Sequence, residues 1–426
     1  MGISIERRGI VRTVVRGGRL FDGTGTPFAP GEFAIENGRI AEIGTDLDGD
    51  TEIDVSGKSV TPGFIDCHVH VGFRDVDFFE ALKRPFALKY YETAHNLATT
   101  LDTGITTARD AGGASLGIKT AVEQGLIRGP RLRISLTMIS QSGGHGDGWL
   151  PSGFETRLFA LDPGIPNGVV NSPDEMRRVV REIIRAGADN IKVATSGGVM
   201  SPRSDPTRPH LSPEELAVLV EEATAAGVHV LAHAQATKGI RNAVEAGIDS
   251  IEHGIFLDAE TVDAMKRKGT WLVPTLMAPR GVLTAAERGI TLPEWALRKA
   301  AEVIEAHKAS ARLAIEAGVK IAYGTDSPVS PHGTNLGEFA LMAELGMSPL
   351  EVLKAATGEA ATLVRVANDV GTLEVGKRAD FVVIDGDPLD FTDYRDKITA
   401  VYQDGSHVGG PTFHGTLTTK SIRTQG

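Results

Sequence analysis

The chain has 426 residues, more than one hydrophobic core usually holds, so we expect one large domain and a smaller one. Its net charge of −11, without any dense basic run, argues against nucleic acid as a partner. No apolar run is long enough to cross a membrane, and the charged N-terminus lacks the apolar core of an export signal. Because the single cysteine, Cys67, permits no internal disulfide and suits a reducing compartment, we expect a cytoplasmic protein without membrane contact.

The two ends of the chain predict short β-strands. Residues 32–44, EFAIENGRIAEIG, alternate in polarity on both sides of Asn37-Gly38, a dipeptide that favours a hairpin because both turn residues need positive φ. A second hairpin signal lies at Asp404-Gly405. We predict one discontinuous β-sandwich domain from residues 1–61 and 366–426. Two separate β-appendages are the alternative, but chain termini usually lie close together.

The middle of the chain, residues 62–365, alternates helix and strand signals. Ser-Pro-x-Glu boxes at Ser172, Ser212 and Ser348 predict capped helix starts, and Thr291 begins a looser version of the box. Glycines that predict helix ends follow, at positions 104, 187, 227, 247, 269 and 318.

Eight short apolar strands complete this pattern, each with room for a helix after it. They are the strand ending in CHVH, ITTARD, RLRISLTM, NIKVAT, VHVLAHA, SIEHG, WLVPT and KIAYGTD. Eight βα units predict an α/β fold of the (β/α)8 TIM-barrel type. A doubly wound sheet is the competing fold, but no strand–GxGxxG–helix unit supports it.

Ionisable residues recur where these strands end. His68 and His70, in GFIDCHVHVG, are two apart and so share one face of a strand. Four other strands end near further ionisable side chains: Lys192, His233, His253 and Asp326. Singly, each has an ordinary explanation, as a core histidine, a lysine reaching solvent or a helix cap. Together, at the carboxyl end of one barrel, they indicate a metal site.

These motifs resemble those of the amidohydrolase superfamily in its binuclear form. The segments NGRIAEIG and VGTLEVGKRADFVVIDGDP resemble that family's β-sandwich. The resemblance implies that His68, His70 and Asp326 bind one divalent metal ion and that His233 and His253 bind a second. It also implies that Lys192 is carboxylated by carbon dioxide and bridges the two ions. We expect zinc; manganese, iron and cobalt are alternatives.

The resemblance also implies a mechanism. A hydroxide that bridges the two metal ions attacks the carbonyl carbon of an amide. Asp326 takes the proton of the attacking water and passes it to the leaving amine, so it acts first as base and then as acid.

Three residues are candidates for substrate contact. His145 lies in the glycine-rich ISQSGGHGDGW loop, Arg203 in the loop after Lys192 could bind a carboxylate, and Gln235 stands where relatives often carry Tyr or His. Arg109 and Asp110 are expected to form a supporting ion pair. Residues 148–170 lack a clear period and are either a lid or an assembly contact.

We therefore predict a metal-dependent hydrolase that cleaves a dipeptide or an N-acyl amino acid, of the Xaa-Pro or Xaa-Arg type. A cyclic amide or a xenobiotic amide or carbamate is the alternative substrate, because imidazolonepropionase-like relatives share this outline. A single-metal deaminase fits less well because that type lacks the bridging lysine, and a barrel without catalysis should show gaps in the ligand set. We expect a small-molecule substrate and, from the apolar helix faces outside the barrel, a homo-oligomer.

Overall fold

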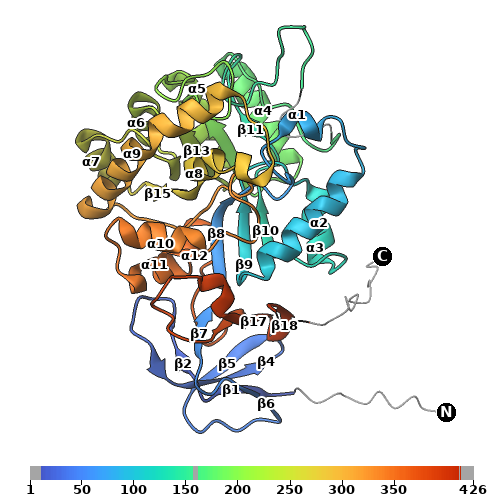
Figure 1. Cartoon of the computed structure of the whole chain (residues 1–426), viewed down its shortest axis with the longest axis vertical. Helices are drawn as coiled ribbons and strands as arrows, with labels where there is room; N and C mark the ends of the chain where they lie inside the picture. The colour runs from blue at the N-terminus through green and yellow to red at the C-terminus, as the bar shows by residue number, and fades with distance from the viewer. Residues whose placement is uncertain (1–10, 157–161, 412, 414–426) are drawn as a thin grey trace, which may run out of the picture.

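The computed structural model describes residues 11–156, 162–411 and 413. A barrel surrounded by helices lies above a smaller group of β-strands, in which the first and last parts of the chain lie side by side (Figure 1). Among the described residues, no helix has the length and apolar character needed to cross a membrane.

The smaller unit contains two sheets. The first has the order β5 (Arg39–Gly44), β4 (Glu32–Glu36), β1 (Thr13–Arg16) and β6 (Thr51–Asp54), and the second has the order β18 (Ser406–Gly409), β17 (Ile398–Gln403), β16 (Phe381–Ile384), β7 (Ser59–Pro62), β2 (Arg19–Leu20) and β3 (Ala29–Pro30). Strand β16 pairs antiparallel with β7, so both chain ends contribute to one sheet. Phe33 of the first sheet packs edge-on against Phe381 of the second, with ring centroids 5.2 Å apart.

Both expected hairpins are confirmed. Strands β4 and β5 pair antiparallel around Asn37-Gly38, with φ values of 51° and 77° at the two turn residues. Strands β17 and β18 pair around Asp404-Gly405, with φ values of 49° and 69°. These dipeptides adopt the left-handed conformation at little cost, which is why the turns can be predicted from sequence.

The barrel strands are parallel and run in chain order. They are β8 (Phe64–Val69), β9 (Ile105–Asp110), β10 (Arg131–Ile134), β11 (Met138–Ile139), β12 (Asn190–Ala194), β13 (His229–Ala234), β14 (Ser250–His253) and β15 (Trp271–Val273). Strands β10 and β11 together correspond to the predicted third strand: β10 pairs with β9 and β11 pairs with β12. The order of the strands confirms the α/β barrel.

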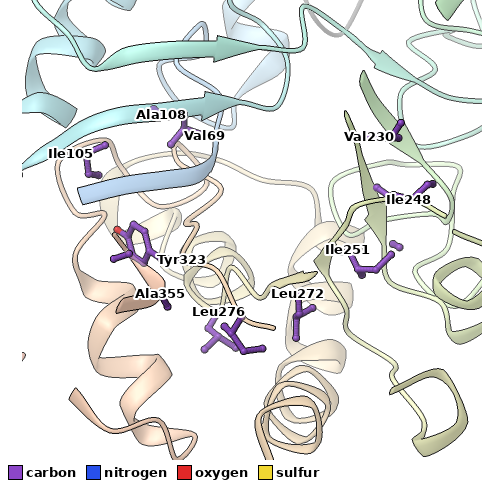
Figure 2. Packing of buried hydrophobic residues seen from close by; sticks show 14 of the residues in the cluster. Val69, Ile105, Ala108, Val230, Ile248, Ile251, Leu272, Leu276, Tyr323 and Ala355 are labelled. Carbon is purple, nitrogen blue, oxygen red and sulfur yellow. The ribbon is translucent and has the colours of Figure 1, made fainter. Parts of the chain in front are cut away.

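The eighth strand is less regular than predicted. Residues 320–327 close the ring through backbone hydrogen bonds, from Leu272 N to Lys320 O (2.9 Å) and from Cys67 N to Tyr323 O (3.0 Å). Only Ile321 and Ser327 form β-bridges in this segment. The pairing is incomplete because the Tyr323 N–H bonds to Ala355 O, outside the ring, and not to the neighbouring strand. Tyr323 and Ala355 lie close together (Figure 2).

Helices cover the outside of the barrel. They are α1 (Phe78–Ala81), α2 (Leu88–Leu101), α3 (Leu116–Glu123), α4 (Pro173–Arg185), α5 (Pro213–Ala225), α6 (Thr237–Ala246), α7 (Ala259–Lys268), α8 (Met277–Leu283), α9 (Glu294–Ala317), α10 (Gly337–Glu344), α11 (Pro349–Ala355) and α12 (Gly358–Leu363). The hydroxyls of Ser172, Ser212 and Ser348 cap α4, α5 and α11 as predicted. The prediction of a capped helix start at Thr291 is wrong. Pro293 occupies the N-cap position of α9, and no side chain of the described residues caps this helix.

The side chains that pack between strands and helices show which strand residues point outward, and therefore which point into the barrel. Val230, Ile251 and Leu272, from three consecutive strands, belong to this outer core (Figure 2). Ala232 and Ala234 belong to it as well. Because side chains alternate along a strand, His233 between these two alanines points into the barrel.

Candidate metal centre

The six predicted ligand residues line one cavity at the carboxyl ends of the barrel strands. They are His68, His70, Lys192, His233, His253 and Asp326. Three of them, His68, His70 and Asp326, place one potential ligand atom each within 4.8 Å of one another. The Oδ1 atom of Asp326 lies 3.4 Å from Nε2 of His68 and 3.3 Å from Nε2 of His70.

A carboxylate fixes the orientation of His68. Its Nδ1 lies 2.6 Å from Oε2 of Glu252, which can only accept, so Nδ1 carries the proton and Nε2 keeps its lone pair. Glu252 is held by Arg109 at 2.9 Å and by the hydroxyl of Ser250 at 2.5 Å. Burial raises the pKa of Glu252, but Arg109 and His68 outweigh this effect and keep the pKa below its usual range.

The other three imidazoles are oriented in the same way. The Nδ1 atom of His70 donates to Gly112 O at 2.8 Å, and Nε2 of His233 donates to Gly197 O at 3.1 Å. Nδ1 of His253 lies 2.7 Å from the hydroxyl of Thr275. That hydroxyl donates to Pro274 O at 2.7 Å and therefore accepts from His253. Each histidine thus commits one ring nitrogen to a protein acceptor. Among the described residues, His233 and His253 do not join the close group of ligand atoms that His68, His70 and Asp326 form.

Burial keeps three of the four rings neutral. It lowers the pKa of His68 to about 4 and holds the pKa values of His233 and His253 well below the usual value. Burial acts on His70 in the same direction, but the hydrogen bond and charge of Asp326 outweigh it and raise the pKa of His70. A neutral imidazole with one N–H bonded to a carboxylate, carbonyl or hydroxyl is the form that binds metal ions. Four imidazoles with one carboxylate fit a site for divalent ions with nitrogen and oxygen ligands, such as zinc.

Lys192 lies within this group rather than at the barrel rim. It is on β12, is 2 % exposed, and its Nζ is 3.4 Å from Nε2 of His68. Burial lowers the pKa of Lys192 to about 8, so a fraction of the amine is neutral near pH 7. An ammonium ion cannot bind a metal and repels dications, whereas a carbamate on Nζ offers two anionic oxygens. The position of Lys192 fits the second form.

Two of the three expected substrate contacts line the same cavity. The ring of His145 stacks on the ring of His233, with centroids 4.1 Å apart and planes 18° apart. Its Nδ1 is buried and makes no hydrogen bond to any described residue, and the same holds for Oε1 of Gln235. Gly198 permits the position of His145, because a Cβ at residue 198 would lie 2.4 Å from the ring. These two polar atoms can bond to a ligand.

Arg203 does not join the cavity, contrary to expectation. Its guanidinium donates to Trp149 O and lies 5.1 Å from the centroid of the Trp149 ring. Both residues line a separate hollow beside residues 137–171. The contact with Trp149 therefore directs the guanidinium away from the six ligand residues. The part of the 148–170 loop at residues 157–161 lies outside the described residues.

Apolar side chains form most of the remaining cavity wall. They include Val76, Met138, Val199, Met200, Ile255, Val282 and Val329. Among the described residues that line the cavity, Lys192 is the one Lys or Arg side chain.

The ion pair around the site differs from the prediction. Arg109 pairs with Glu252 and not with Asp110, because neighbouring residues on a strand point to opposite faces. Asp110 instead accepts backbone N–H groups of Val71, Gly112 and Ala114. The role of Glu252 was missed. Its sequence signal is a carboxylate within an otherwise apolar strand, directly before His253.

Known proteins with similar sequences belong to the family that the sequence motifs resemble. Residues 59–410 match the sequence profile of the Amidohydrolase family. The chain is 34 % identical over 422 residues to ochratoxinase of Aspergillus niger, covering 94 % of this chain and 87 % of the relative.

Two solved structures are similar over their whole length. A Xaa-Pro dipeptidase with bound methionine is 32 % identical with a TM-score of 0.85. A prolidase in complex with N-methylphosphonate-L-proline is 35 % identical with a TM-score of 0.86. Both alignments cover 94 % of this chain and 100 % of the relative.

Proposed function

The chain belongs to the amidohydrolase family, and we propose that it hydrolyses a dipeptide or an N-acyl amino acid at a centre of two divalent metal ions. One observation carries this proposal. The four histidines line one cavity with Lys192 and Asp326, and each fixes one ring nitrogen on a protein acceptor. Core histidines have no reason to share that arrangement.

We assign the ligands in two groups. His68, His70 and Asp326 would hold one ion, His233 and His253 would hold the other, and a carbamate on Lys192 would supply anionic oxygens to both. When bound, such ions lower the pKa of a water molecule toward ~7 and polarise a carbonyl group. Zinc matches four imidazoles and a carboxylate.

Asp326 is the group that moves the proton. Its carboxylate faces Nε2 of both His68 and His70 across 3.4 and 3.3 Å, so it lies at the centre of the ligand set. It takes a proton from the attacking water and returns it to the nitrogen of the leaving amine. The products are a carboxylic acid and an amine.

His145 and Gln235 orient the substrate. The two residues border the cavity and each contributes a buried polar atom without a hydrogen bond. We assign to His145 the donation of a hydrogen bond to the substrate carbonyl and to Gln235 the contact with a polar group beside the scissile bond.

A xenobiotic amide is the second candidate substrate. The apolar cavity wall favours it, and so does the absence of Arg among the described cavity residues. Arg is the residue that usually binds a free carboxylate, which a dipeptide has and a xenobiotic amide can lack. Ochratoxinase, at 34 % identity, is a relative of this kind. We further propose a cytoplasmic location and a homo-oligomer, in keeping with the single buried cysteine and the apolar side chains exposed at Phe86 and Tyr91.

A substrate panel tests the proposed function. The zinc-loaded protein is assayed for released amine with Xaa-Pro and Xaa-Arg dipeptides, N-acyl amino acids, cyclic amides and apolar aryl amides. Turnover of dipeptides or N-acyl amino acids supports the first substrate class, and turnover of aryl amides alone supports the second. No release of amine from any amide by the metal-loaded protein would contradict the proposal.

A further inference from the structure

Helix α9 makes three separate side-chain contacts with the site end of the barrel. Lys299 donates to the carbonyls of Ser201, at 2.8 Å, and of Ser204, in the loop that follows Lys192. One face of the helix then continues with His307, and with Ser310, whose hydroxyl donates to Ile255 O at 2.6 Å. Residues 299, 307 and 310 share this face because about 3.6 residues complete one helical turn.

His307 is the contact that reaches the proposed metal ligands. Its Nε2 lies 3.0 Å from His253 O and 2.8 Å from Pro274 O. Both partners are carbonyls, so Nε2 carries the proton and shares it between them. The side chain is 2 % exposed, which makes the loss of this donor costly for two buried carbonyls.

The backbone at this point is strained. His253 has a φ of 74° and Thr275 a φ of 51°. This conformation is uncommon for any residue other than Gly and is an outlier for a β-branched residue such as Thr. Pro274 O receives the Thr275 hydroxyl as well as His307. With its proton committed there, the hydroxyl accepts from Nδ1 of His253. The donor on α9 therefore supports both the backbone and the tautomer of His253.

We infer that His307 is a positioning residue for the metal centre, which holds the ends of β14 and β15 so that Nε2 of His253 faces the second metal ion. The inference rests on the proposed function, because it takes His253 to be a ligand. His307 is also among the residues that line the cavity, but the inference gives it a role through His253 and not through contact with the substrate.

Four variants test this role through metal affinity. H307L removes the donor at similar volume, and H307N shortens the side chain so that its amide cannot reach the two carbonyls. H307Q keeps an N–H at the position of Nε2. K299M removes another buried donor from the same helix face, but one that bonds to the loop at Ser201.

Each variant is loaded with zinc, and the affinity for each ion is measured by competition with a chelator. We expect H307L and H307N to bind one of the two ions about 10–100-fold more weakly, as for other groups that orient ligands, and to lose kcat more than KM. H307Q should recover most of the affinity. K299M should bind both ions as the unsubstituted protein does and change KM instead, because Val199 and Met200 of its loop line the cavity.

The outcomes separate the two proposals. Unchanged affinity in both H307L and H307N, or an equal loss in K299M, would overturn the role of His307 while the unsubstituted protein still binds two ions. If the unsubstituted protein binds no zinc, the proposed function fails and the role of His307 fails with it. Should H307L not fold, H307N and H307Q still give the comparison.

Discussion

The hairpin tips of the small β-sheets and the proposed metal centre both contain residues with positive φ, and they stabilise this conformation by different means. In the small β-sheets, Asn37 and Asp404 have φ values of 51° and 49° at the tips of hairpins. At the metal centre, His253, Thr275 and Asp326 have φ values of 74°, 51° and 59°. The hairpins use residues that adopt this conformation at little cost, whereas His and Thr are disfavoured there, at about 1–3 kcal/mol each.

The difference shows where each conformation is determined. At a hairpin, the turn dipeptide and the flanking strands are sufficient. At the metal centre, the supporting contacts come from distant elements: Asp326 N bonds to His68 O at 2.7 Å, and the carbonyl of His253 bonds to His307 on α9. The residues with positive φ at the site therefore depend on the whole barrel being folded.

Removal of Lys192 should produce the largest effect. Lys192→Ala removes the proposed bridging group, and we expect kcat to fall by about 10³-fold or more, since the charge stabilisation that two ions would supply is worth several kcal/mol. Lys320→Ala, which removes an exposed lysine at the opposite end of the barrel, serves as the control. Residual activity within tenfold of the original would contradict the bridging role.

Neutralising Glu252 should affect both stability and metal binding. Glu252→Gln leaves the charge of Arg109 uncompensated in the core, which should lower the free energy of unfolding by about 3 kcal/mol, and it weakens the orientation of His68. The surface pair of Arg298 and Glu302, 3.1 Å apart, provides the matched control: Glu302→Gln should cost less than about 0.5 kcal/mol. Denaturant unfolding measures both, and equal costs would refute the argument.

Glycine substitutions test the comparison of the two regions directly. Thr275→Gly relieves the positive φ but removes the hydroxyl that fixes His253, so zinc affinity should fall about 10–100-fold. Asn37→Gly should change the free energy of unfolding by only a few tenths of a kcal/mol and leave zinc affinity unchanged. A gain of zinc affinity in Thr275→Gly would mean that strain, rather than the hydroxyl, dominates at this position.

Truncation of Arg203 should have the smallest effect on catalysis. Because its guanidinium bonds to Trp149 O outside the cavity, Arg203→Ala should change kcat/KM by less than about twofold for substrates with and without a free carboxylate. A loss of kcat/KM that is confined to substrates with a free carboxylate would instead support the carboxylate-binding role expected from the sequence.

Features that neighbouring residues determine could be predicted from the sequence, whereas features that depend on tertiary contacts could not. The hairpins at Asn37 and Asp404 and the capped starts at Ser212 and Ser348 were predictable, because neighbouring residues determine them. The ionisable residues at the strand ends could be recognised because apolar strands surround them.

The supporting residues could not be recognised in this way. His307 acts on a carbonyl 54 residues away, and Glu252 meets a histidine 184 residues away. A carboxylate in an otherwise apolar strand marks Glu252 as unusual, but nothing near Glu252 or His307 in the sequence identifies the partner of either residue. The same holds for the irregular eighth strand, where the hydrogen bond from Tyr323 N to Ala355 O takes the place of a bond to the neighbouring barrel strand.

The metal content of the protein, measured together with its carbamate, tests the central claim most directly. The protein is stripped of metal and then reconstituted with zinc and ¹³C-labelled bicarbonate, and zinc equivalents are counted while ¹³C NMR detects a carbamate. We expect two zinc ions and one labelled carbamate per chain, both absent from Lys192→Ala. Because burial lowers the pKa of Lys192 to about 8, labelling at fixed dissolved carbon dioxide should speed up as the pH rises from 6 to 8. One zinc ion and no labelled carbon on Lys192 would contradict the account.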